Sequence, residues 1–134
     1  MKRLVVAFAA LLLALSPAAA QDTAKDWPPK NVRIVVPFGP GSTPDIVARL
    51  IGENLQQKYP NSTFIVENKG GAGGNIGMGL VARAEPDGYT ILLSTSAYSV
   101  NPGLYQNLPY DPFKDFVAIC ELAVSPHVFA VKPD

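Results

Sequence analysis

The chain has 134 residues, with 11 lysines and arginines against 11 aspartates and glutamates, and a single cysteine. This balance gives no support to nucleic-acid binding or to a polybasic membrane contact. One cysteine excludes an internal disulfide framework and a multi-thiolate metal site. Aliphatic runs recur along the chain, which argues against intrinsic disorder.

The first 20 residues have the pattern of a secretory signal peptide. A basic start at Met1–Arg3 precedes an unbroken apolar run from Leu4 to Leu15, and small residues follow up to Ala20. An apolar run of this length is too short to cross a hydrocarbon core of about 30 Å. We therefore expect cleavage after Ala20 and export of a product that begins at Gln21.

The mature chain opens with a polar, proline-containing stretch over 21–30, which we expect to be a flexible lead-in. The stretch 31–37 carries a short β-branched run without clean alternation, formed by Val32, Ile34, Val35 and Val36. This pattern is typical of a strand buried on both faces of a parallel sheet. A loop over 38–42 then leads into a helix predicted over 43–59, with Thr43 as the capping residue.

The same order of elements repeats along the next part of the chain. Residues 63–67 predict a second strand, 68–75 a glycine-rich loop, 76–84 a helix weakened by two glycines, and 90–95 a third strand. This alternation indicates a parallel α/β sheet with right-handed crossovers.

A proline-rich stretch and two apolar runs, at 116–124 and 127–131, complete the chain. We expect the last run to be a strand, and no predicted helix follows it to cover it. The chain is therefore expected to be part of a longer protein.

Three loops, over 38–43, 68–75 and 94–101, follow the carboxyl ends of the predicted strands, where open α/β sheets bind their ligands. The first loop also precedes a helix N-terminus, whose N–H groups favour an anion. Gly39 and Gly41 would allow the main chain to approach that anion. A glycine-bearing turn with a capped helix and no ligand explains the same residues equally well.

The glycine-rich loop does not predict a nucleotide site. Gly71-x-Gly73 meets Ile76 where the dinucleotide fingerprint requires a small residue, and no Gly-Lys-Ser/Thr triplet is present. The looser match that starts at Gly77 lies inside a predicted helix. We interpret the loop as a flexible or tightly turned connection.

Residues for catalysis are scarce. His127 is the one histidine and lies in an apolar run, and Cys120 lies in another, where we expect a buried and inert thiol. No Gly-x-Ser-x-Gly elbow is present. The sequence therefore predicts no catalytic residue, no metal ligand and no cofactor.

Four motifs occur along the chain, and their order identifies a protein family more specifically than any single motif does. They are VPFGPGSTPDIVAR at 36–49, VENKGGAGGNIG at 66–77, PDGYT at 86–90, and the segment 101–116 with its LPYDP core. Together they resemble the tripartite tricarboxylate transporter receptors, also called Bug-type solute-binding proteins, over residues 31–131. The resemblance implies a fold like that of type II periplasmic binding proteins. Residues 31–134 would form an incomplete first lobe, with a mainly parallel sheet flanked by helices.

The resemblance also implies a function: a monomeric periplasmic receptor that binds a small carboxylate and passes it to the membrane subunits of a secondary transporter, without catalysis. The family holds the ligand carboxylate with the loop after the first strand and with a facing loop of the same lobe. The matching positions here are Phe38, Gly41, Ser42, Thr43, Asp45, Ser94, Ser96 and Asn101. Ser42 stands where the family usually has a second glycine.

Two questions stay open at the level of sequence. The alternatives to a receptor are an exported α/β enzyme acting on an anionic metabolite, and a truncated product without a function of its own. Asp45 could pair with the amine of an amino-acid ligand, or it could serve only the start of its helix.

Overall fold

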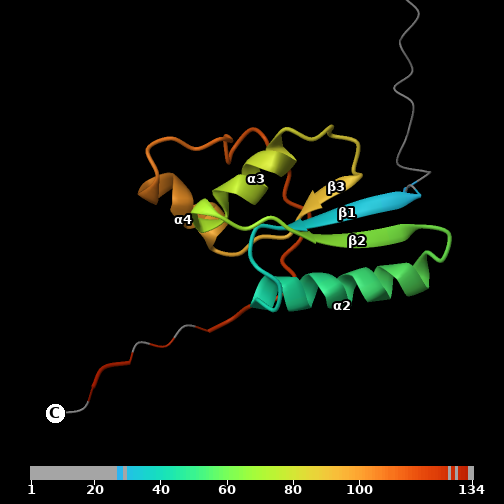
Figure 1. Ribbon diagram of the computed structural model, residues 1–134, viewed down its shortest axis with the longest axis horizontal. Helices are drawn as coiled ribbons and strands as arrows, with labels where there is room; N and C mark the ends of the chain where they lie inside the picture. The colour runs from blue at the N-terminus through green and yellow to red at the C-terminus, as the bar shows by residue number, and fades with distance from the viewer. Residues whose placement is uncertain (1–26, 29, 127, 129, 133–134) are drawn as a thin grey trace, which may run out of the picture.

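The computed structural model describes residues 27–28, 30–126, 128 and 130–132 (Figure 1). The predicted signal peptide over 1–20, residues 21–26 of the predicted lead-in, and His127 lie outside the described residues.

Three parallel strands form a sheet in the order β2-β1-β3. Their bounds are Asn31–Val36 for β1, Thr63–Asn68 for β2 and Thr90–Leu92 for β3. Val32, Val35 and Val36 of the central strand have no exposed surface, which confirms the predicted strand buried on both faces. β3 is shorter than predicted, because the strand pairing ends at Leu92 and the chain then turns toward another helix.

Helices lie on both sides of the sheet, as Figure 1 shows. α2 (Thr43–Lys58) packs on one face, where its Ala48 joins Ile34, Val36 and Leu93 in the buried core. The short 3-10 turn η2 (Ala72–Gly74) leads into α3 (Asn75–Ala82) on the opposite side. None of the helices that the structure describes has the length and apolar character needed to span a membrane.

α2 has a different capping residue from the predicted Thr43. Ser42 takes the N-cap position, with extended backbone angles, and its carbonyl accepts the N–H of Ile46 at 3.0 Å. Thr43 is the first helical residue, and Pro44 lies in the first turn, where its missing N–H removes no hydrogen bond.

The segment predicted as a loop over 94–101 contains a helix that the sequence did not reveal. α4 spans Ala97–Leu104 and includes Pro102, whose missing N–H and ring are unfavourable inside a helix. The Thr95 hydroxyl accepts the N–H of Ala97 at 3.3 Å, and Asn101 anchors the helix through its buried amide. The local bond at Thr95 and the tertiary contact of Asn101 offset the cost of the proline.

The prediction of a buried Cys120 is wrong, because its thiol is exposed. The surrounding segment over 117–126 is neither helix nor strand, and Val117 is 91% exposed. A β-branched run forms a strand only where a neighbour supplies backbone partners, and none of the strands in the described part pairs with this segment. The predicted strand over 127–131 lies partly outside the described residues.

The described end of the predicted lead-in is in contact with the rest of the chain. Trp27 donates its ring N–H to the Gly88 carbonyl at 3.2 Å and stacks edge-on against Tyr59, with ring centroids 6.0 Å apart. The Lys30 carbonyl accepts the N–H of Thr63 at 2.7 Å. These contacts join residues 27 and 30 to the rest of the described chain, and the flexibility of the lead-in stays a prediction.

Candidate ligand-binding site at the carboxyl edge of the sheet

The end of the sheet at Val36, Asn68 and Leu92, called the carboxyl edge below, carries three loops, because parallel strands all end on the same side. The loops after β2 and β3 are fixed to β1. Lys69 donates its N–H to the Val36 carbonyl at 2.8 Å, and Leu93 donates to Val35 at 3.0 Å. The first and second loops also touch, since a Cβ at Gly70 would lie 3.6 Å from the carbonyl carbon of Phe38.

The first loop brings the N-terminus of α2 to this edge. Gly41 has a φ of +80°, a conformation that a side chain disfavours. Ser42 turns back on the loop, donating its hydroxyl to the Gly39 carbonyl at 2.7 Å and its N–H to the same oxygen at 3.3 Å. Among the described residues, the first-turn N–H groups left for a ligand are those of Thr43 and Asp45.

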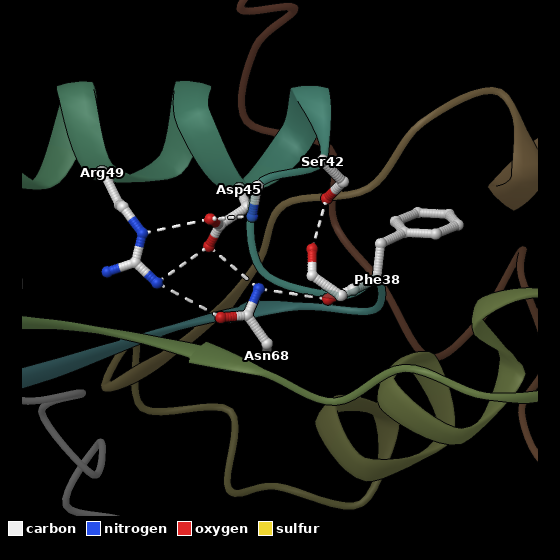
Figure 2. A network of polar contacts seen from close by, with 7 residues as sticks. Phe38, Ser42, Asp45, Arg49 and Asn68 are labelled. Atoms are coloured by element: carbon white, nitrogen blue, oxygen red, sulfur yellow. Dashed lines mark hydrogen bonds and ion pairs between the residues drawn. The ribbon is translucent and has the colours of Figure 1, made fainter.

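Figure 2 shows Asp45 at the centre of a polar network that joins α2, the first loop and β2. Its Oδ2 accepts the N–H of Gly41 at 2.8 Å and the Nε of Arg49 at 3.1 Å. Its Oδ1 accepts the Asn68 amide at 2.9 Å and lies 3.0 Å from Nη2 of Arg49. The same Asn68 amide donates to the Phe38 carbonyl at 3.1 Å.

These contacts favour the charged form of a buried carboxylate, whose residue is only 2% exposed. The hydrogen bonds from Arg49, then from the Gly41 N–H and the Asn68 amide, lower the pKa of Asp45 to about 2. Arg49 neutralises the Asp45 carboxylate at close range. The carboxylate therefore reduces the positive potential at the N-terminus of α2 only slightly.

Ser94 has an unusual environment on the third loop. Its Oγ is buried and has no hydrogen-bond partner, the one such side-chain atom in the described part of the chain. Ser94 follows Leu93, whose N–H still bonds β1, so it lies at the carboxyl edge beside the end of that strand. A buried hydroxyl without a partner is unfavourable, and a ligand acceptor at this edge would satisfy it.

The glycine-rich loop is tightly turned, which confirms one of its two interpretations. Positive φ angles occur at Gly71, Ala72, Gly73 and Gly74, at 123°, 49°, 64° and 95°. A Cβ at Gly74 would lie 3.5 Å from the ring of Phe38. The loop therefore packs on the first loop and walls one side of the carboxyl edge.

The other two residues that the resemblance assigned to the third loop have structural contacts. The Ser96 carbonyl accepts the N–H groups of Ser99 and Val100, and its side chain makes no capping bond. Asn101 is 4% exposed and donates its amide to Gly73 at 3.0 Å and to Asn75 at 2.7 Å. A ligand contact by Asn101 would therefore have to use its oxygen.

The edge offers donors and few ionised groups. The Lys69 ammonium lies 3.7 Å from a Glu67 carboxylate, and Arg33 donates to the same carboxylate at 2.8 Å. The described residues hold no group of three histidine, cysteine, aspartate or glutamate side chains that could bind a metal ion. The arrangement suits an anion held by main-chain N–H groups and a hydroxyl.

Sequence reasoning missed Asn68 and Arg49, which complete the network around Asp45. Arg49 lies four residues after Asp45 in a predicted helix, so the i, i+4 ion pair could have been found from spacing. Asn68 could not, since its contact with Asp45 depends on how α2 packs against β2.

Comparison with known proteins identifies the family to which this chain is similar. Residues 47–134 match the tripartite tricarboxylate transporter family receptor. A UPF0065 protein of Bordetella pertussis is 40% identical over 130 residues, covering 96% of this chain. The chain spans about 38% of the length of that relative.

Several solved structures share both fold and sequence with the chain. The periplasmic binding protein BugD is 48% identical with a TM-score of 0.63, over 67% of this chain and 30% of BugD. An adipate-bound protein of R. palustris is 39% identical (TM-score 0.62, 66% of this chain and 29% of that one). MatC from Rhodopseudomonas palustris, with bound malate, is 38% identical (TM-score 0.59, 67% and 31%). The chain belongs to the tripartite tricarboxylate transporter receptor family.

Proposed function

We propose that the chain is the carboxylate-binding part of a periplasmic receptor that delivers its ligand to a tripartite tricarboxylate-type transporter, without catalysis. The observation that carries the proposal is the buried, unpartnered Oγ of Ser94 at the edge where α2 begins. Two similar structures, at 39% and 38% identity, contain adipate and malate. A carboxylate bound at this edge would accept hydrogen bonds from the Ser94 hydroxyl and from the N–H groups at the start of α2.

The physical basis is the electrostatics of a helix start. The N-terminus of α2 carries a partial positive charge, and the free N–H groups of Thr43 and Asp45 can donate to one carboxylate group. Hydrogen bonds to an ionised acceptor are shorter and stronger than those between neutral groups. Specificity for an anion follows from this geometry without a dedicated arginine.

A single lobe leaves the bound anion exposed to water on one side. We propose that a second lobe in the whole receptor encloses the ligand, excludes water and strengthens each hydrogen bond. For the 134-residue chain alone we expect a dissociation constant of about a millimolar or weaker, against micromolar or tighter when enclosed.

We further propose that residues 1–20 direct export and are removed, so that the periplasmic product begins at Gln21. The apolar run of the N-terminus and the periplasmic binding proteins among the similar structures support this assignment. N-terminal sequencing of the periplasmic fraction should give Gln-Asp-Thr. A soluble product that retains Met1 would contradict the assignment.

Replacing Ser94 with alanine should weaken malate binding about tenfold while leaving the fold intact. The variant loses one hydrogen bond to an ionised ligand and removes a buried hydroxyl that has no partner in the free chain. Chemical-shift titration by nuclear magnetic resonance (NMR) measures millimolar affinities, and circular dichroism checks the fold.

Ser99→Ala is the matched control, because Ser99 is an exposed residue of α4 and its variant should bind malate as the parent chain does. Equal malate affinities for Ser94→Ala and Ser99→Ala would contradict the assignment of Ser94 to the site.

A further inference from the structure

The carboxylate of Asp45 has no acceptor capacity left. An ionised carboxylate offers about four lone-pair positions, and four donor contacts occupy them here. Gly41 N–H and Arg49 Nε approach Oδ2 at 2.8 and 3.1 Å, while Asn68 Nδ2 and Arg49 Nη2 approach Oδ1 at 2.9 and 3.0 Å. An ammonium group of a ligand would have to displace one of these donors.

The same network fixes the shape of the first loop. The bond from Gly41 holds the loop at a residue with a positive φ of 80°, and Asn68 holds the Phe38 carbonyl from the side of β2. The loop is therefore fixed at both ends, once to α2 and once to the sheet (Figure 2). Neither bond uses the N–H groups of Thr43 and Asp45.

We propose that Asp45, together with Asn68, is a positioning residue that shapes the anion-binding loop, and that it does not read an amine on the ligand. The inference rests on the proposed carboxylate-binding function and refines its ligand class. The N-terminus of α2 would recognise a carboxylate group alone, so a malate-like hydroxy acid and its amino analogue depend on Asp45 to the same degree.

Asp45→Asn separates the two roles. The amide keeps one oxygen for the Gly41 N–H, but its nitrogen then faces the donors of Arg49 and Asn68. Positioning predicts that malate and aspartate affinities both fall, by the same factor of about ten. An amine contact predicts a selective loss of aspartate binding.

Asn68→Ala provides a second variant that keeps the Asp45 charge and frees one of its lone-pair positions. Positioning predicts that both ligands again weaken equally. An amine contact predicts that aspartate binding becomes stronger relative to malate, because the freed lone-pair position can accept the ammonium group. Glu53→Gln is the control, since it makes the same acid-to-amide change at an exposed position of α2.

A ligand-free measurement tests the loop directly. In the amide NMR spectrum of the unliganded chain, Asp45→Asn should shift the Gly41 resonance and speed its exchange with solvent, while Glu53→Gln leaves both unchanged. A general loss of stability would not single out Gly41 at temperatures far below the melting transition.

Each result has a defined meaning. A selective loss of aspartate binding in Asp45→Asn, or an unaltered Gly41 amide, would overturn the positioning role. Should Asp45→Asn fail to fold, the malate-to-aspartate affinity ratio and the Gly41 amide of Asn68→Ala decide between the roles. A parent chain that binds neither malate nor aspartate would instead count against the proposed function. The amide NMR measurement at Gly41 needs no ligand, so it would still test the positioning role.

Discussion

Replacing Gly77 with alanine should destabilise the chain by about 2–3 kcal/mol, a large share of the roughly 5–15 kcal/mol by which native proteins are stable. A Cβ at Gly77 would lie 2.6 Å from the Lys69 carbonyl oxygen and 2.9 Å from the Cα of Pro37. Both are backbone atoms next to the carboxyl edge, so they cannot move aside as a flexible side chain would. α3 would have to separate from the ends of β1 and β2.

Denaturant unfolding followed by circular dichroism measures this loss. Gly103→Ala is the matched control, because a Cβ at Gly103 has no neighbour within 4 Å and α4 gains a better helix former. The control should be as stable as the parent or slightly more stable. If Gly77→Ala matched Gly103→Ala, the close approach of α3 to the carboxyl edge would be wrong.

Replacing Gly41 with valine should reduce malate affinity about 100-fold or more, which puts binding by this chain beyond detection. The positive φ of 80° is strained for a β-branched residue, so the loop would relax to another conformation. That relaxation would move the N–H groups of Thr43 and Asp45, each worth about 1.5 kcal/mol or more to a charged acceptor. No atom lies within 4 Å of a Cβ there, so the fold should survive.

Gly88→Val is a demanding control for this effect. Gly88 has nearly the same φ, 79°, and precedes β3 at the amino end of the sheet, far along the strands from the carboxyl edge. Its variant carries the same backbone strain and a contact with Trp27, yet it should still bind malate. If a folded Gly41→Val variant bound malate as tightly as the parent, the assignment of the first loop to the site would be wrong.

The strands of the sheet could be predicted from sequence because their signal is local. The β-branched run at 31–36 requires burial on both faces, and a helix on each side supplies it. The apolar run at 116–124 contains similar residue types and forms no strand, because none of the described strands is a partner for it. Residue pattern predicts a strand only if tertiary structure supplies the neighbour.

The candidate site was predictable in outline and not in detail. The loop at Gly41 and the helix that follows it could be predicted because glycine and a capping residue mark such a start, although Ser42 and not the predicted Thr43 is the N-cap. The role of Asp45 could not be predicted, because its partner Asn68 is 23 residues away along the chain. α4 was missed because Pro102 is a strong local signal against a helix, and the buried amide of Asn101 offsets it.

The measurement that most directly tests carboxylate binding at this edge is an amide chemical-shift map of the 134-residue chain, titrated with malate and with its neutral diamide. We expect saturable shifts with malate, at about millimolar concentration, centred on the amides of Thr43, Asp45 and Ser94, and no saturation with the diamide. Equal shifts with the diamide, or saturable shifts centred on 117–126 away from the carboxyl edge, would contradict the proposed site.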